Sequence, residues 1–291
     1  MCIRDRFKAN GVTGIEGWAR LLGDGKVEVT PHEGDKQTLE AEHIIIATGS
    51  EPVQLKIAPH DGESIVDSWD ALDFTAVPKR LGIIGAGVIG VELGSVWSRL
   101  GAETVLLEAA ESFLPMVDAA ISKEALRHYG KQGLDIRLGA KVIKAAKKGK
   151  GVEVSFELKG KTETETFDKL IVAVGRRPFT DKLGAEDVGL ELDERGFIKV
   201  DKGYRTNLKN VYATGDVIGG AMLAHKAIEE GVALVEQLAG HHTQVNYKAV
   251  PSVIYTAPEV AWVGMSEAEA KAAGHLSLIH ISEPTRPLYI S

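Results

Sequence analysis

The sequence predicts an α/β protein in which one domain of alternating strands and helices is inserted into another. Residues 81–108 follow the order strand, glycine turn, helix and strand, which is typical of a unit built on parallel strands. Two apolar strands that end in glycine turns, at 44–49 and 211–215, lie on either side of this unit in the chain. When similar strands flank a complete unit in the chain, they are expected to belong to one domain into which the complete unit is inserted.

The inserted unit has the pattern of a dinucleotide-binding, Rossmann-like domain. Strand Leu81–Ile84, helix Val88–Leu100 and strand Thr104–Glu108 follow one another, with three glycines at the first turn. The start of the helix offers free backbone N–H groups and the positive end of its dipole to a pyrophosphate. The strand–turn–helix context makes this pattern more specific than the glycines alone.

Each residue of the turn has an expected role. Gly85 allows the chain to turn tightly, Gly87 leaves room for the pyrophosphate, and Gly90 lets the helix approach the strand. Glu108 is expected to accept hydrogen bonds from the adenosine ribose hydroxyls, and its charge would repel a 2′-phosphate. The sequence therefore predicts NAD rather than NADP at this site.

Both ends of the chain are expected to be foreign to the protein. Residues 1–6 and 276–281 can be encoded by nucleotide strings that are reverse complements, apart from the last base of each. Unrelated protein ends have no reason to share this relation, which resembles a sequencing adapter read in both directions. We therefore expect 7–275 to be an internal fragment, and we take 1–6 and 276–291 as foreign segments that do not bear on the predicted fold. Natural disordered tails are the alternative.

Composition argues against several classes of function. Acidic residues outnumber basic ones, 41 to 34, and the net charge of −7 argues against a nucleic-acid surface. The basic run 141–150 is better explained as the solvated edge of a hairpin. No apolar run approaches the ~18 residues of a membrane span. The single cysteine, Cys2, lies in a segment expected to be foreign, so neither a disulfide scaffold nor thiol chemistry is expected of 7–275.

The rest of the chain is expected to form strands and helices around the nucleotide unit. Residues 12–30 alternate polar and apolar residues between glycines, as in an antiparallel meander, and 39–47 read as one strand. The other predicted elements are a short helix near Ser68–Leu72, helices Ala119–Gln132 and Met222–Leu238, strands Asp135–Leu138, Val142–Ala146, Val152–Leu158, Glu163–Phe167, Lys169–Val174 and Val211–Ala213, and a strand-and-helix unit over Val250–Val263 and Ser266–Ala273.

Five runs along the chain carry a resemblance to a known family. These runs are Glu42–Glu51, Leu81–Ala102, Val174–Thr180, Val211–Gly231 and Pro251–Gly264. Many flavoproteins share the Thr-Gly-Asp and glycine turns, whereas 222–226 and 252–256 are more particular to this family. On these residues the chain resembles the dihydrolipoamide dehydrogenases, of the flavin-dependent pyridine nucleotide-disulfide oxidoreductase family.

The resemblance implies a Rossmann-like NAD-binding domain inserted into a partial FAD-binding domain, followed by the start of an α+β dimerisation domain. We expect the first remainder of the FAD domain at 7–80 and the NAD domain at 81–205. The FAD domain would return at 206–249, and the interface domain would begin at 250–275.

The resemblance also implies two sets of cofactor-binding residues. The NAD set is Gly85, Ala86, Gly87, Val88, Ile89, Gly90, Val91, Glu92, Glu108, Val142 and Gly175. The FAD set is Ala19, Thr48, Gly49, Ser50, Asp216, Met222, Leu223, Ala224 and His225. His225 is expected to contact the cofactor at the helix start rather than act as a base. No His, Cys or Asp cluster has the spacing of metal ligands.

Two further residue assignments remain open at this stage. Glu92 would lie near the junction of flavin and nicotinamide, or serve only as a favourable acid in the first turns of its helix. Arg176 and Arg177 would steer the dinucleotide phosphates, or form an ion-paired loop.

The resemblance implies a homodimer that oxidises protein-bound dihydrolipoamide through a dithiol and FAD, with hydride transfer to NAD⁺. Its partners would be lipoyl domains of 2-oxo acid dehydrogenase or glycine cleavage complexes, in the bacterial cytoplasm or the mitochondrial matrix. The dithiol, the His–Glu acid–base pair and the first FAD fingerprint are not in this sequence. No catalytic residue is therefore assigned, and the fragment is expected to be inactive. The alternatives are another flavin disulfide reductase or transhydrogenase of the family, and a non-catalytic NAD-binding module.

Overall fold

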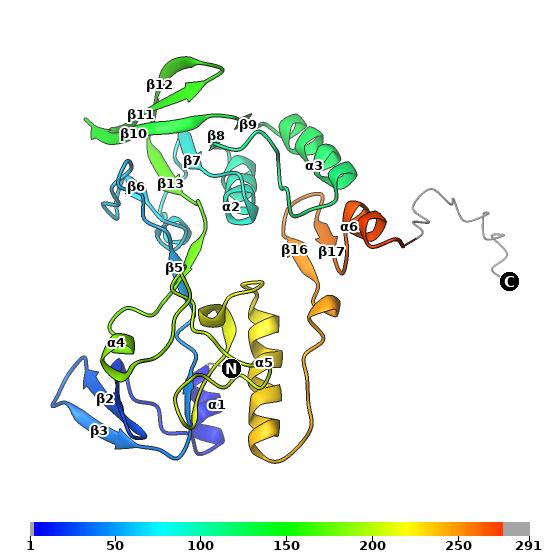
Figure 1. Ribbon diagram of the computed structural model, residues 1–291. Helices are drawn as coiled ribbons and strands as arrows, with labels where there is room; N and C mark the ends of the chain where they lie inside the picture. The colour runs from blue at the N-terminus through cyan, green and yellow to red at the C-terminus, as the bar shows by residue number, and fades with distance from the viewer. Residues whose placement is uncertain (1–2, 276–291) are drawn as a thin grey trace, which may run out of the picture. The chain divides into compact units, whose positions relative to one another are not determined.

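The computed structural model describes residues 3–275, which divide into two compact units (Figure 1). Unit 1 combines residues 3–51 and 176–245, and unit 2 combines 52–175 and 246–275. The chain leaves unit 1 after 51 and returns to it at 176, which confirms the predicted insertion of one α/β unit into another. Over the described part of the chain, no helix has both the length and the apolar character that crossing a membrane requires.

Unit 2 is built on a five-stranded parallel sheet in the order β6-β13-β7-β8-β9. Ile83 of β7 lies beside Leu106 of β8 and Ile171 of β13. Helix α2 connects β7 to β8 and packs on both, and α3 leads into β9. The elements are β6 (Ile65–Val66), β7 (Arg80–Ile84), α2 (Val88–Arg99), β8 (Glu103–Glu108), α3 (Ala119–Lys131), β9 (Leu134–Leu138) and β13 (Lys169–Val172).

The two faces of this sheet are buried in two separate cores. Ile83 and Leu106, both fully buried, pack into the core that contains α2 and α3. Ile84 and Leu107 point to the other face, where an antiparallel sheet covers them. Burial on both faces explains why the strands read as continuous apolar runs. The covering sheet consists of β10 (Lys141–Lys148), β11 (Gly151–Leu158) and β12 (Lys161–Phe167).

The last described residues belong to unit 2. Ile254 and Val260 of the antiparallel hairpin β16–β17 are buried in the core with α2 and α3. Ser266 caps α6 through a capping box with Glu269, in which each side chain accepts a hydrogen bond from the other residue's backbone N–H. The remaining elements of this unit are η1 (Asp70–Leu72), η3 (Tyr247–Ala249), β16 (Ser252–Ile254), β17 (Val260–Trp262) and α6 (Glu267–Ala272).

Unit 1 combines small sheets with one long helix. The meander β1-β2-β3 is antiparallel, β4 pairs in parallel with β15, and β5 pairs with β14. Leu21, Ile46 and Val217 are buried in its larger core. Its elements are α1 (Ile3–Ala9), β1 (Gly17–Gly23), β2 (Lys26–Pro31), β3 (Gln37–Glu40), β4 (Ile44–Ile46), β5 (Ser50–Pro52), β14 (Arg176–Pro178), α4 (Ala185–Val188), β15 (Val211–Ala213), η2 (Gly215–Ile218) and α5 (Ala224–Leu238).

The largest difference in extent between a predicted and an observed strand concerns residues 39–47. The single strand expected at 39–47 is two strands, because Leu39 pairs with Val27 in the meander whereas Ile44–Ile46 pairs with β15. Residues 41–43 between them belong to neither ladder. In contrast, the predicted elements of the nucleotide unit over 81–108 agree with the structure to within one residue at each boundary.

The compact units do not follow every expected domain boundary. Residues 176–205 cluster with unit 1 and residues 52–80 with unit 2, and the NAD domain expected at 81–205 stays a prediction. The physical reason is that β13 (Lys169–Val172) is the last strand of the parallel sheet along the chain, so the residues after 175 no longer pair with that sheet. Helix α1 includes residues 3–6, whose foreign origin stays a prediction, and the segment 276–291 lies outside the described residues.

Candidate functional site

A pocket of about 630 Å³ lies in unit 2, beside the glycine turn that follows β7. Its lining comes from residues after the carboxyl ends of β7, β8 and β13, and from β10. The carboxyl ends of parallel strands are where open α/β sheets bind ligands. The predicted NAD residues in this lining are Gly85, Gly87, Val88, Ile89, Glu108, Val142 and Gly175.

The glycine turn combines close backbone approach with free space. A Cβ on Gly90 would lie 2.1 Å from the carbonyl oxygen of Gly85, so only glycine lets α2 pack this closely on the turn. Gly85 itself has a φ of +100°. A Cβ on Gly87 would meet no atom within 4 Å, and Gly87 is also the N-cap of α2. The start of the helix is therefore open to a ligand on the side of Gly87.

Glu108 is bound to the glycine turn. Its Oε2 accepts a hydrogen bond from the backbone N–H of Ala86 at 2.8 Å, and its Oε1 accepts one from Ala110 N–H at 2.8 Å. Sequence reasoning did not foresee these bonds. Each carboxylate oxygen has a second lone pair, so ribose hydroxyls can still donate to the same group.

Other members of the predicted NAD set do not line this pocket. Val91 of α2 is fully buried in the core with Ile83 and Leu106, and Ala86 is buried in the turn. Glu92 accepts a hydrogen bond from the backbone N–H of Tyr255 at 2.8 Å, which ties α2 to the segment after β16. A structural link for Glu92 is therefore present, and its expected place beside the nicotinamide stays a prediction.

Ser50 and Asp216 of the predicted FAD set form a hydrogen-bonded chain with Arg176 in unit 1. Ser50 Oγ donates to Asp216 Oδ2 at 2.5 Å, and Arg176 Nε donates to Ser50 Oγ at 2.7 Å. The same guanidinium donates to the carbonyl oxygen of Ser50 at 2.6 Å. Ser50 is buried, whereas Asp216 is half-buried.

The rest of the predicted FAD set lies in three places, and one of its members, Gly49, has a φ of +74° and accepts a hydrogen bond at its carbonyl oxygen from the backbone N–H of Phe179 at 2.9 Å. Ala19 and Thr48 line a second pocket of about 390 Å³, together with Trp18, Phe179 and Leu183. Residues 222–225 lie at the start of α5, whose N-cap Leu223 offers no side-chain cap. They are not in the lining of either pocket described above.

The two arginines at the start of β14 differ in their contacts. Arg177 forms ion pairs with Glu51 and, at 2.8 Å, with Asp181. Arg176 instead binds Ser50 through the two hydrogen bonds given above. Of the two interpretations left open, these contacts favour the ion-paired loop for Arg177.

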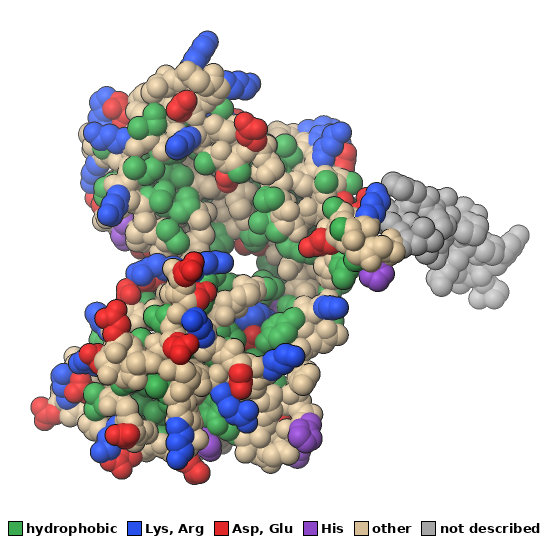
Figure 2. Space-filling model, in the orientation of Figure 1, with side chains coloured by type: hydrophobic (Ala, Val, Ile, Leu, Met, Phe, Trp, Pro, Cys, Tyr) green, Lys and Arg blue, Asp and Glu red, His purple; other side chains and the backbone are tan. Residues whose placement is uncertain are grey.

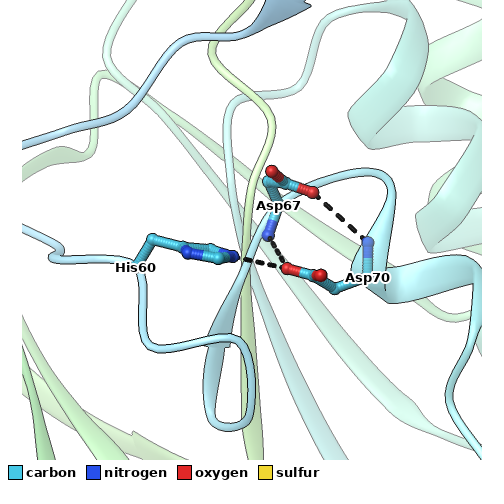
Figure 3. Close-up of side chains that lie close together, drawn as sticks. All are labelled: His60, Asp67 and Asp70. Atoms are coloured by element: carbon cyan, nitrogen blue, oxygen red, sulfur yellow. Dashed lines mark hydrogen bonds and ion pairs between the residues drawn. The ribbon is translucent and has the colours of Figure 1, made fainter. Parts of the chain in front are cut away.

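Sequence reasoning missed one cluster with the chemistry of metal ligands. His60, Asp67 and Asp70 bring their ligand atoms within 4.8 Å of one another (Figure 3). His60 Nε2 lies 2.5 Å from Asp70 Oδ2, and Asp67 Oδ1 accepts from the backbone N–H groups of Trp69 and Asp70 at the start of η1. These bonds explain the cluster as a local turn, and no independent feature of the described residues points to a cation there.

Charged side chains are mixed on the surface. Figure 2 shows Lys and Arg interspersed with Asp and Glu on the visible face. Several of them form exposed ion pairs, such as Lys147 with Glu63 at 2.7 Å. The basic run 141–150 therefore has acidic neighbours, as expected for a solvated hairpin edge.

These features define a two-domain α/β protein that binds a dinucleotide. They are the parallel sheet, its glycine turn, the acid at the end of the next strand, and the insertion of one unit into the other. The family model for pyridine nucleotide-disulphide oxidoreductases matches residues 3–231, and the model for the dimerisation domain of that family matches 250–285. The chain therefore belongs to the pyridine nucleotide-disulphide oxidoreductase family.

Similar proteins cover nearly all of this chain but extend beyond it. Dihydrolipoyl dehydrogenase 3 of Pseudomonas aeruginosa is 46% identical over 269 residues, which are 92% of this chain and 57% of that protein. Mitochondrial dihydrolipoyl dehydrogenase of Bos taurus is 47% identical over 276 residues, covering 92% of this chain and 53% of that protein. The chain thus spans little more than half the length of these relatives.

A solved structure of a flavoprotein has a similar fold. The Cu(II) complex of the HOCl-induced flavoprotein disulfide reductase RclA from Escherichia coli matches with a TM-score of 0.84 and 30% identity. The match covers 94% of this chain and 62% of that one.

Proposed function

We propose that this chain is part of a dihydrolipoyl dehydrogenase that binds NAD in unit 2 and contributes to an FAD site in unit 1. The complete protein would oxidise protein-bound dihydrolipoamide through a dithiol and FAD, with hydride transfer to NAD⁺. The two dihydrolipoyl dehydrogenases described above are 46% and 47% identical to this chain, whereas the flavoprotein disulfide reductase of known structure is 30% identical. The difference favours the dehydrogenase over another disulfide reductase of the family.

The observation that carries the proposal is the convergence of the glycine turn, Glu108, Val142 and Gly175 on one pocket. The first turn of α2 would hold the pyrophosphate through its backbone N–H groups, and Glu108 would accept bonds from the adenosine ribose. Val142, which is buried, would pack against the apolar part of the ligand. NAD⁺ bound here would supply the hydride acceptor.

The residues of unit 1 fit a flavin in part. Asp216 follows the end of β15, and its carboxylate is oriented by Ser50. Such an acid can accept a bond from a ribityl hydroxyl. The start of α5 can stabilise negative charge on a nearby ring, because its N-terminal backbone N–H groups carry partial positive charge. We infer that both features contact FAD in the complete protein.

Catalysis requires groups that these 291 residues do not supply. The chain contains one cysteine, Cys2, so it cannot form a redox-active dithiol by itself. We expect it to bind nucleotide without oxidising dihydrolipoamide. The complete protein would act as a homodimer with lipoyl domains of 2-oxo acid dehydrogenase or glycine cleavage complexes, in the bacterial cytoplasm or the mitochondrial matrix.

A binding experiment on the purified chain tests the proposal. NADH titration, followed by the change in NADH fluorescence, should show saturable binding, and NADPH should bind at least about tenfold more weakly because its 2′-phosphate meets Glu108. Circular dichroism would verify that the chain is folded. A folded chain that binds neither dinucleotide would overturn the assignment of the pocket.

A further inference from the structure

Helix α5 contains a buried ion pair. Lys226 Nζ lies 2.9 Å from Glu230 Oε1, and the two side chains are 2% and 1% exposed. Two charges removed from water at an i,i+4 spacing need further hydrogen bonds to offset their lost hydration. One residue outside the helix bonds both members of the pair.

That residue is Gly215, in the turn after β15. Its backbone N–H donates to Glu230 Oε2 at 2.8 Å, and its carbonyl oxygen accepts from Lys226 Nζ at 3.4 Å. The ion pair thus holds both polar backbone groups of one turn residue. Gly215 has a φ of +81°, and a Cβ built on it would lie 3.3 Å from Ala227 Cβ. The turn is therefore fixed against α5 by hydrogen bonds and by close packing.

Gly215 immediately precedes Asp216. The Asp216 carboxylate accepts from Ser50 Oγ at 2.5 Å, and Ser50 in turn accepts from Arg176 at 2.7 Å. Asp216 is thus held at its side chain by Ser50 and at the preceding peptide by the ion pair. These contacts all lie within unit 1.

We propose that Lys226 and Glu230 are positioning residues that fix the Gly215 turn, so that Asp216 presents its carboxylate to a hydroxyl of the flavin side chain. This inference rests on the proposed FAD site, and it deepens that proposal by naming residues that act without touching the cofactor. A role in stability alone explains the pair poorly, because apolar residues of similar volume in place of a buried ion pair are often as stable.

Two double variants that differ in one near-isosteric side chain separate these roles. K226M/E230M removes both charges and both bonds to Gly215. K226M/E230Q also removes the charges, but its amide oxygen can still accept from the Gly215 N–H. K199M/E191L is the matched control, because Lys199 and Glu191 form an exposed ion pair in the same unit, with side chains 57% and 59% exposed.

The first readout is amide hydrogen exchange at Gly215, measured by NMR on the chain without cofactor. We expect exchange in K226M/E230M to be at least about tenfold faster than in the wild type, the size of one lost hydrogen bond to a charged group. K226M/E230Q should regain most of the protection, and K199M/E191L should not change it. Unchanged exchange in folded K226M/E230M would overturn the proposal. So would a wild-type Gly215 amide that exchanges as fast as that of exposed Gly220.

The second readout is the dissociation constant for FAD, from quenching of flavin fluorescence. K226M/E230M should weaken FAD binding about tenfold, with recovery in K226M/E230Q. Faster Gly215 exchange with unchanged FAD affinity would overturn the positioning role. If the wild-type chain binds no FAD, the proposal that unit 1 contributes to a flavin site is overturned. Amide exchange at Gly215 would still decide whether the ion pair fixes the turn.

Discussion

The carboxylate of Glu108 accepts a hydrogen bond from the backbone N–H of Ala86 at 2.8 Å, which joins the end of β8 to the glycine turn after β7. Its other oxygen accepts from Ala110 at 2.8 Å. One side chain therefore fixes two loops and also offers its remaining lone pairs to the pocket. The residue that would read the ribose is thus part of the frame that holds the pyrophosphate loop.

Replacing Glu108 should change nucleotide binding in a way that depends on the new side chain. Glu108→Gln keeps the shape but loses the charge and one acceptor, so the Kd for NADH should rise about tenfold. Glu108→Arg should move the preference toward NADPH, because a cation would face the 2′-phosphate. Parallel titrations with NADH and NADPH measure both effects.

Glu111→Gln is the control for these variants, since Glu111 is exposed and does not line the pocket. It should leave both dissociation constants unchanged. A Glu108→Arg variant with the wild-type ratio of NADH to NADPH affinity would count against the ribose role.

Alanine at three glycines should separate binding from stability. Gly90→Ala forces a Cβ against the Gly85 carbonyl and should destabilise the protein by about 1–3 kcal/mol. Gly87→Ala meets no protein atom within 4 Å, so it should leave stability nearly unchanged and weaken NADH binding. Gly130→Ala, in an exposed turn of α3, should stabilise by up to about 1 kcal/mol.

Urea unfolding and NADH titration of the three variants measure these effects. Equal losses of stability for Gly87→Ala and Gly90→Ala would contradict the conclusion that Gly87 faces open space whereas Gly90 packs against the Gly85 carbonyl.

The sequence was sufficient to predict structure where the local pattern of residues and their physical role agree. The glycine turn at Gly85–Gly90 and the acid Glu108 at the end of the next strand could be located because the strand, turn and helix patterns agree there, whereas their contacts with NAD stay a prediction. The extent of the strand predicted at 39–47 could not be derived, since an apolar run does not specify which ladder each part joins. Pairing with Val27 or with β15 is decided by distant residues.

In the candidate site, too, contacts between residues that are distant in the sequence could not be predicted. Lys226 and Glu230 have helical i,i+4 spacing that the sequence displays, but that spacing is also common in exposed pairs. Their burial and their bonds to Gly215 depend on how α5 packs against the turn after β15. The link from Glu92 to Tyr255 likewise joins residues that are far apart in the sequence.

Glu165 joins the antiparallel sheet to the parallel sheet of unit 2. Its two oxygens form ion pairs with Arg80 of β7 and Arg137 of β9. Burial alone would raise the pKa of the Glu165 carboxyl, but hydrogen bonds from Arg137 and Arg80, together with their charges, lower it below its ordinary value. Because these side chains are partly exposed, Glu165→Gln should destabilise the protein by only about 1 kcal/mol at neutral pH.

The pH dependence of this effect follows from the direction of the pKa shift. A carboxyl with a lowered folded-state pKa stabilises the fold above its unfolded pKa, and this contribution disappears as the pH falls through the folded value. The difference in unfolding free energy between wild type and Glu165→Gln should therefore shrink below about pH 4. Glu163→Gln, an exposed acid on the same strand, is the control. A difference that stays constant down to acid pH would contradict the ion-pair origin.

Breaking the buried pair in α5 from one side should cost more than removing it. Lys226→Met alone leaves the Glu230 charge buried without its cation, which should destabilise the protein by about 3–5 kcal/mol. The double variant K226M/E230M should be much closer to the wild type. Urea unfolding of the single and double variants measures the coupling, and equal destabilisation in the two would contradict it.

Within unit 2, Tyr129 of α3, whose ring is buried, links this helix to the segment after β16. Its hydroxyl lies 2.6 Å from Thr256 Oγ1, just after β16, and burial raises the pKa of this hydroxyl, so it stays protonated. Tyr129→Phe should keep the packing of the ring and lose about 1 kcal/mol from the hydrogen bond. We therefore expect faster proteolysis within residues 250–275 in this variant, with cleavage elsewhere unchanged. Tyr255→Phe, whose ring is 71% exposed, should have no effect, and equal cleavage in all three proteins would show that the hydroxyl does not hold the hairpin.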